Sequence, residues 1–71
     1  MPMLTKQQKK VLDFVKSYAK DNGMPPTRME IATNFSWRSA NAAQSHLILI
    51  ERKGYIRLLD KGVSRGIAIL K

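Results

Sequence analysis

The 71-residue sequence contains no cysteine, a single histidine and only five acidic residues. Because cysteine is absent, the chain has neither a disulfide framework nor a thiolate metal site. One histidine and five carboxylates provide no metal cluster, no catalytic triad and no paired-carboxylate motif, and there is no glycine-rich phosphate loop. The sequence therefore predicts a protein that is not an enzyme, with no catalytic residues, no metal, no cofactor and no small-molecule ligand.

Long hydrophobic segments are missing as well. The longest strongly apolar run, Leu47-Ile48-Leu49-Ile50, is far shorter than the roughly 20 residues that cross a bilayer. The N-terminus also lacks the apolar segment of a signal peptide. A chain of this length buries about 60% of its unfolded surface, which suffices for one small core. We therefore expect one domain over residues 1–71, located in the cytoplasm with the nucleoid and without a membrane partner.

Positive charge, in contrast, is abundant. Thirteen lysine and arginine residues against five acidic residues give a formal net charge of +8. A basic folded domain favours a polyanionic partner, with nucleic acid the first candidate and an anionic membrane surface the second. The hydrophobic content of 44% argues against a disordered basic tail. Because the cations are spread along the chain, only folding can gather them on one surface.

The first predicted helix runs from about Lys6 to Asn22. Thr5 and Gln8 match a capping box, in which two side chains satisfy free backbone N–H groups at a helix start. Gly23 provides the left-handed position that commonly ends a helix. Apolar residues recur with helical spacing and form one broad face, which consists of Val11, Leu12, Phe14, Val15, Tyr18 and Ala19. This face is needed for the single core, which argues against a membrane-surface helix.

Two shorter helices are expected next. Thr27 and Glu30 form a second capping box, which opens a helix of about two turns. Ser39 is a suitable N-cap for a third helix, which runs to about Lys53 and is closed by Gly54. The inward positions are expected to be Ile31, Ala32 and Phe35 in the second helix and Ala43, Leu47 and Ile50 in the third.

The last part of the chain changes to a strand-like pattern. Tyr55–Leu59 and Val63–Leu70 are rich in branched residues, which favour strands. Between them, Asp60-Lys61-Gly62 has the composition of a short hairpin turn. The predicted fold class is therefore mainly α with a small β-hairpin, in the order α-α-α-β-β.

The second and third predicted helices indicate a DNA-binding arrangement. Two helices joined by a short turn, the second polar on its outer N-terminal half, are typical of a helix-turn-helix. The third helix would then enter the major groove, which is about 12 Å wide. Asn41, Gln44 and Ser45 are the predicted base readers, since an amide can donate and accept at adenine N6 and N7. The basic hairpin, with Lys61 and Arg65, would lie beside this helix as a wing against phosphate or the minor groove.

Plainer interpretations stay open for several of these residues. The polar side chains of the third helix equally fit an ordinary solvated surface, and capping alone explains Ser39. His46 fits packing or one phosphate hydrogen bond. Trp37 fits a cover over the small core better than a partner surface. Arg28, beside the start of the second helix, is a candidate phosphate contact.

Motifs along nearly the whole chain resemble one known family. The most specific is Gly23-Met24-Pro25-Pro26-Thr27-Arg28 with Glu30-Ile31-Ala32, accompanied by Leu4-Thr5, Gln7-Gln8, Arg38-Ser39, Asn41-Ala42-Ala43, His46-Leu47, Arg52-Lys53-Gly54 and Ser64-Arg65-Gly66-Ile67. With these residues the chain resembles the N-terminal DNA-binding domain of the LexA family of SOS-response repressors. The resemblance implies a winged helix-turn-helix that represses transcription in a bacterial or phage-infected cell. It would bind inverted-repeat operators in double-stranded DNA, with a homodimer on two half-sites as an option.

The resemblance also assigns DNA contacts. It implies that Ser39, Asn41 and Ala42 face bases, and the position of Gln44 and Ser45 in the same helix adds these two side chains. The expected contacts to the DNA backbone or through the wing are Arg28, Arg38, His46, Arg52, Lys53, Lys61, Ser64 and Arg65.

The chain departs from the family pattern inside the predicted DNA-binding segment. Two acidic residues are common where this chain has Gln44 and Ser45, which do not accept from cytosine N4 as carboxylates do. The operator sequence therefore does not follow from the resemblance. Ser36 stands where glycine is common, Trp37 where a smaller aromatic residue is usual, and Ala40 where proline is found.

The C-terminal half of LexA has no counterpart in these 71 residues. That half carries dimerisation, the self-cleavage site and the Ser-Lys catalytic pair. We therefore interpret the chain as either an excised domain or a free-standing relative, for example one carried by a phage. The second reading leaves an alternative function, a LexA-like interaction module that modulates a host repressor or RNA polymerase. Asn41→Ala separates the two hypotheses, because it should weaken DNA binding and leave partner binding intact.

Overall fold

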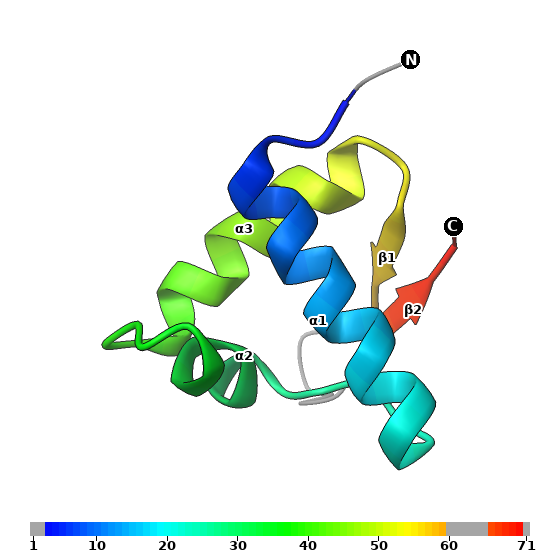
Figure 1. Cartoon of the computed structure of the whole chain (residues 1–71). Helices are drawn as coiled ribbons and strands as arrows, with labels where there is room; N and C mark the ends of the chain where they lie inside the picture. Colours follow the sequence, from blue (N-terminus) through cyan, green and yellow to red (C-terminus); the bar gives the residue numbers. More distant parts are fainter. Residues whose placement is uncertain (1–2, 60–65, 71) are drawn as a thin grey trace.

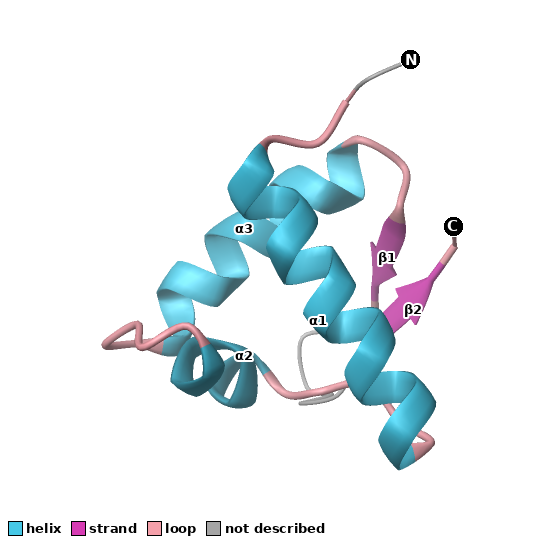
Figure 2. Cartoon of the chain, in the orientation of Figure 1, coloured by secondary structure: helices cyan, strands magenta, loops and turns pink. Residues whose placement is uncertain are grey.

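The computed structural model describes residues 3–59 and 66–70, and within this part three helices precede a two-stranded antiparallel sheet (Figures 1 and 2). The elements are α1 (Lys6–Asn22), α2 (Arg28–Asn34), α3 (Ala40–Arg52), β1 (Ile56–Leu58) and β2 (Ile67–Ile69). The predicted order and the mainly helical class are confirmed. None of the helices in the described residues combines the length and apolarity that a membrane span requires.

Both predicted capping boxes are present. At the start of α1, the Gln8 N–H donates to Thr5 Oγ1 over 3.1 Å, and the Thr5 N–H donates to Gln8 Oε1 over 3.0 Å. At the start of α2, Thr27 and Glu30 exchange the same two bonds over 3.0 and 2.8 Å. These reciprocal bonds satisfy N–H groups that have no partner within the helix. Gly23 ends α1 with a φ of 72°, as its sequence position predicts.

The start of α3 differs from the prediction. Ser39 occupies the N-cap position, but its side chain makes no capping hydrogen bond. The N–H of Ala42, which a capping side chain would normally bind, donates instead to the main-chain carbonyl of Ser39 over 3.3 Å. Because Ala42 has no polar side chain, it also cannot return a bond as Gln8 and Glu30 do. The hydroxyl of Ser39 is therefore not committed to the helix start.

The two strands pair as an antiparallel ladder. The ladder pairs Ile56 with Ile69 and Leu58 with Ile67. One further hydrogen bond extends it at each end, from the Leu70 N–H to the Tyr55 carbonyl and from the Leu59 N–H to the Gly66 carbonyl. The paired backbone therefore covers the first predicted strand and the described part of the second, from Gly66 to Leu70. The predicted turn at residues 60–62 lies outside the described residues.

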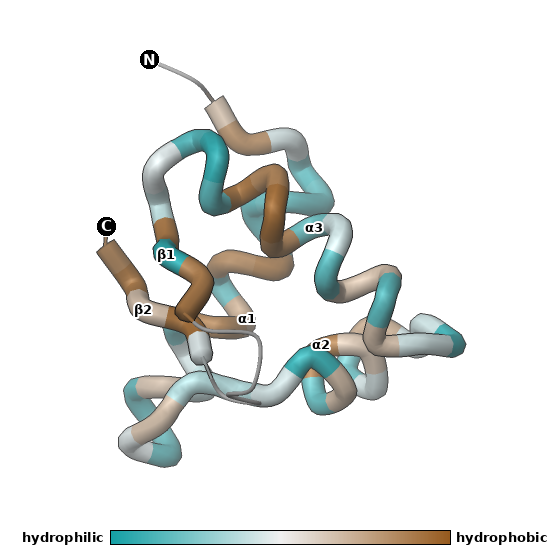
Figure 3. The backbone as a smooth tube through the Cα atoms, turned by 180° about the vertical axis from the view of Figure 1, so that it is seen from behind, coloured by the Kyte–Doolittle hydropathy of each residue, from teal (hydrophilic) through white to brown (hydrophobic). Residues whose placement is uncertain are grey.

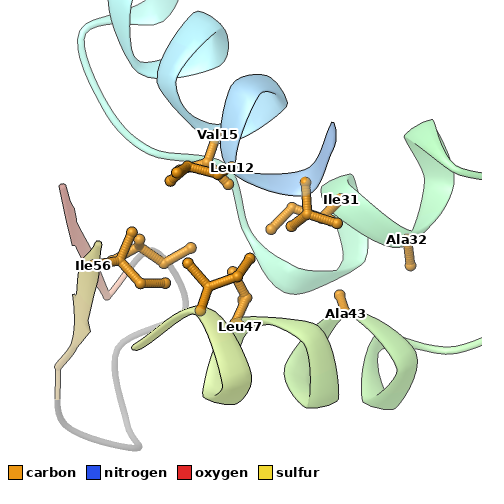
Figure 4. Close-up of a cluster of buried hydrophobic side chains, with 10 residues drawn as sticks. Leu12, Val15, Ile31, Ala32, Ala43, Leu47 and Ile56 are labelled. Carbon is orange, nitrogen blue, oxygen red and sulfur yellow. The ribbon is translucent and has the colours of Figure 1, made fainter. Parts of the chain in front are cut away.

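A single core joins all five elements. It consists of Val11, Leu12, Val15, Ile31, Ala32, Ala43, Leu47, Ile50, Ile56 and Ile67, each less than 9% exposed. Figure 4 shows these side chains converging from α1, α2, α3 and the sheet. In Figure 3, α3 is mixed in its first half, hydrophobic over Leu47–Ile50 and hydrophilic at its end. The buried face of α3 consists of Ala43, Leu47 and Ile50. The polar side chains of its first half lie on the opposite, outer side of the helix.

Candidate nucleic-acid interface

Helices α2 and α3 form the predicted helix-turn-helix. Their small residues Ala32 and Ala43 are fully buried and point toward one another at the contact between the two helices (Figure 4). Alanine on both sides lets the two backbones approach closely. The turn is closed by the Trp37 N–H, which donates to the Ala32 carbonyl over 2.8 Å. Ser36 takes a left-handed φ of 59° in this turn, which explains why glycine is common there in the family that the sequence resembles.

A stack of aromatic rings fixes this turn against α3. Phe35 lies 4.9 Å from Trp37, and Trp37 lies 4.6 Å from His46, both as centroid distances between nearly parallel rings. Phe14 of α1 and Phe35 pack edge to face, with ring centroids 5.9 Å apart. Trp37 is half-buried and packs on the core, which confirms its predicted covering role. His46 also packs in this stack, and its Nδ1 donates to the Ala42 carbonyl over 2.8 Å, while its predicted phosphate contact stays a prediction.

The base-contact candidates occupy the free side of α3. Asn41, Gln44 and Ser45 follow a spacing of three and four residues, which places them on one helix face. Asn41 and Ser45 are exposed, whereas Gln44 is half-buried. Ser39, just before the helix, is exposed. Ala42 follows Asn41 directly, so it lies beside this face of the helix, and it is half-buried. The structure therefore brings the five candidates onto the first two turns of α3 and the residue before it.

Three predicted contact residues surround one surface hollow between α2 and α3. Arg28, Asn41 and Gln44, with Ala40, line this hollow of about 240 Å³. Arg28 Nε and Gln44 Oε1 are buried and have no hydrogen-bond partner within the described residues. Buried polar atoms without a partner are uncommon in folded proteins.

The backbone-contact candidates fall into different environments. Arg38 in the turn and Arg52 at the end of α3 are exposed, so both guanidinium groups are available to phosphate. Lys53 is half-buried, and its Nζ donates to the Met3 carbonyl over 2.7 Å and to Gln8 Oε1 over 2.6 Å. Its ammonium therefore ties the end of α3 to the start of α1 and keeps one N–H for another acceptor. Lys61, Ser64 and Arg65 lie outside the described residues.

Sequence reasoning missed two polar contacts that position α3 and α2. The Leu58 N–H donates to Glu51 Oε2 over 2.7 Å, which ties β1 to α3. The Tyr18 hydroxyl donates to Glu30 Oε2 over 2.9 Å, which ties α1 to α2. Each contact joins residues on different elements, so no local spacing indicates it. In residues 3–59 and 66–70, histidine and carboxylate side chains form no group of three or more that fits a metal ion.

Comparison with known proteins gives a consistent result. The family described as "LexA DNA binding domain" matches residues 1–66. The LexA repressor of Colwellia psychrerythraea is 50% identical over 68 residues, which cover 96% of this chain and 32% of that protein. The LexA repressor of Leptothrix cholodnii is 53% identical over 68 residues, covering 96% of this chain and 29% of the relative. The LexA repressor of Petrotoga mobilis is 49% identical over 70 residues, covering 99% and 33%. The chain thus spans about a third of the length of the curated relatives that it matches.

Proposed function

Because the chain belongs to the LexA DNA-binding domain family, we propose that it binds double-stranded DNA sequence-specifically and represses transcription. The observation that carries this proposal is the arrangement of α3. Its second half is anchored in the core, while its first half carries Asn41, Gln44 and Ser45 on one uncovered face. A helix mounted in this way fits the major groove, because the groove admits one α-helix and its floor carries the base edges.

The chain's charge brings it to DNA before any base is read. A net charge of +8 attracts the phosphate backbone and accelerates encounter. Arg28 at the start of α2, Arg38 in the turn and Arg52 at the end of α3 are the described cations that we assign to phosphates. Phosphate contacts fix the register of α3 on the duplex, whereas contacts to base edges discriminate between sequences. We assign Lys61, Ser64 and Arg65, which lie outside the described residues, to the DNA backbone as wing residues, because the sequence predicts a basic hairpin there.

Two copies on an inverted repeat complete the proposed mechanism. One domain of this size contacts a single half-site and binds it weakly. Two domains held on adjacent half-sites about one helical turn apart gain affinity and select for the spacing between the half-sites. Occupation of such an operator by two copies would block transcription from the adjoining promoter. A homodimer on two half-sites is therefore part of the proposal.

The proposal is tested by selecting bound duplexes from a randomised pool and measuring binding of the selected duplex by fluorescence anisotropy. We expect an enriched inverted repeat that binds far better than a scrambled duplex. Asn41→Ala should weaken binding to the selected duplex by roughly 10-fold or more and leave scrambled binding unchanged, because a base contact contributes only to the correct site. Ser17→Ala, at an exposed position of α1, is the matched control and should change neither.

The same experiment addresses the alternative of a protein-interaction module, which the family match does not favour. That alternative predicts no enriched motif, only salt-sensitive binding of any duplex through the basic surface. It also predicts that Asn41→Ala and Ser17→Ala bind DNA equally. Either result would overturn the proposal that α3 reads an operator.

A further inference from the structure

Ile48, in the third turn of α3, is a large apolar side chain that lies outside the core. It is half-buried, and within the described residues it belongs neither to the buried cluster nor to the partly buried hydrophobic side chains packed against that cluster. The core side of the helix is formed by Ala43, Leu47 and Ile50 instead. Single exposed apolar side chains are common on protein surfaces, so the place of Ile48 on the helix decides what it can contact.

That place is the face of the base-contact candidates. Successive residues of an α-helix are about 100° apart, so Ile48, seven residues after Asn41, projects within about 20° of the same direction. Gln44 and Ser45 precede Ile48 by four and three residues and are its neighbours on the helix surface. Arg52, which we assign to a phosphate, is its neighbour four residues later. Ile48 therefore lies between the predicted base readers and a predicted phosphate contact.

The major groove offers one apolar group to such a side chain. Every base pair presents hydrogen-bonding atoms there, but among the four bases only thymine adds a methyl group, at C5. In an A·T pair this methyl lies at the side of the groove nearest the backbone of the thymine strand. A side chain between base contacts and a phosphate contact is placed to meet it. Because isoleucine has no polar atoms in its side chain, it can discriminate between bases only through apolar contact.

We propose that Ile48 contacts the C5-methyl group of a thymine in each half-site and makes that operator position specific for thymine. This inference rests on the proposed function of sequence-specific DNA binding. The contact would remove both the methyl group and the apolar surface of Ile48 from water, which is favourable in proportion to the area buried. Cytosine lacks the methyl group, so it would lose this contact without any change in size elsewhere on its ring.

Leu49 provides the matched control on the same helix. It is apolar and 42% exposed, so it offers more free surface than half-buried Ile48. It projects about 100° away from Ile48, off the line that joins Asn41 to Arg52. Leu49→Ala therefore removes comparable apolar surface from α3 without changing the proposed thymine contact.

The test uses the complete 71-residue chain and the duplex selected from a randomised pool. Each thymine of one half-site is replaced in turn by deoxyuridine, which lacks only the C5-methyl group. The wild type should lose affinity by roughly 3- to 5-fold at the contacted thymine, as expected for one buried methyl group. Ile48→Ala should bind the thymine and deoxyuridine duplexes equally at that position, whereas Leu49→Ala should respond as the wild type does. Circular dichroism melting establishes that both variants are folded.

Methylated cytosine gives a second test at the same position. The wild type should bind a duplex with 5-methylcytosine there roughly 3- to 5-fold better than one with cytosine, because the two differ only in the methyl group. Ile48→Ala should bind both equally. Since the wild-type measurements need no variant to fold, they can overturn the proposal alone.

Each outcome has a distinct meaning. If the wild type enriches no motif, the proposed operator reading fails and this inference fails with it. If a motif is enriched but deoxyuridine weakens the wild type nowhere, or only where it weakens Ile48→Ala equally, the operator reading stands and the methyl contact is overturned. A loss in Ile48→Ala that appears on the inverted repeat but not on a single half-site would assign Ile48 to a contact between two copies of the chain and would also overturn the proposal.

Discussion

The indole of Trp37 lies flat on the imidazole of His46, with ring centroids 4.6 Å apart and planes inclined by 11°. Phe35 covers the other face of the indole at 4.9 Å. Trp37, in the turn between α2 and α3, thus stacks both on Phe35 at the end of α2 and on His46 of α3. Because the angle between α2 and α3 sets how α3 meets a groove, this stack is a structural determinant of the proposed interface.

Replacing His46 should weaken the turn without removing the core. Aromatic pairs contribute about 0.5–1.5 kcal/mol beyond the area they bury, so His46→Ala should lower the free energy of unfolding by about 1 kcal/mol. Urea denaturation, followed by the fluorescence of the single tryptophan, measures the change directly. The matched control is Ser45→Ala, which alters an exposed neighbour on the same helix and should leave stability unchanged. Equal midpoints for the two variants would show that the stack does not stabilise the fold.

Ser36 carries the only positive φ of a non-glycine residue in the described part of the chain. A left-handed conformation costs an L-residue about 1–2 kcal/mol, and glycine removes this cost while gaining some freedom in the unfolded chain. Ser36→Gly should therefore raise the free energy of unfolding by about 0.5 kcal/mol, and Ser36→Val should lower it by more than that amount. Ser39→Gly, at an extended φ of −142°, provides the contrast and should give no gain. An unchanged or lower stability of Ser36→Gly would contradict this argument.

The sequence predicts this fold well because its signals are local. Two capping boxes each need only residues three apart, and the apolar period of α1 needs only its own 17 residues. The prediction for α3 is less complete at Ser39. A serine indicates a cap by residue type, but here the N–H three residues later bonds to a main-chain carbonyl, and no polar side chain at Ala42 returns a bond.

The candidate site is predictable only in part. The face formed by Asn41, Gln44 and Ser45 follows from helical spacing alone. The hollow beside Gln44 depends on how α2 and α3 cross, so the buried oxygen of Gln44 has no signature in the sequence. In the same way, Lys53 and Gln8 are 45 residues apart, and their contact follows from the packing of α3 on α1.

The uncommitted hydroxyl of Ser39 leads to a prediction that separates stability from DNA binding. Ser39→Ala removes no capping bond, so it should lower the free energy of unfolding by only a few tenths of a kcal/mol and weaken binding to the selected duplex. Thr27→Ala removes a capping bond of 3.0 Å and should cost about 1 kcal/mol. Urea denaturation and anisotropy on both variants measure the two effects. A loss of stability in Ser39→Ala as large as in Thr27→Ala would mean that the hydroxyl does cap α3 in solution.

Arg52 and Lys53, adjacent cations at the end of α3, should respond differently to the same replacement. Arg52 is exposed, so Arg52→Met should reduce the slope of log affinity against log salt by about 1, as expected for one lost phosphate contact, with stability unchanged. The Lys53 ammonium bonds Met3 and Gln8 of the N-terminal segment, so Lys53→Met should lower the free energy of unfolding by about 1–2 kcal/mol. Lys53→Met should also change the salt slope less than Arg52→Met, because two of the three ammonium hydrogens are already used within the chain. Anisotropy titrations at several salt concentrations, with urea denaturation of the free proteins, distinguish the two roles. Identical salt slopes and identical stabilities in the two variants would contradict the assignment of a phosphate contact to Arg52 and a structural contact to Lys53.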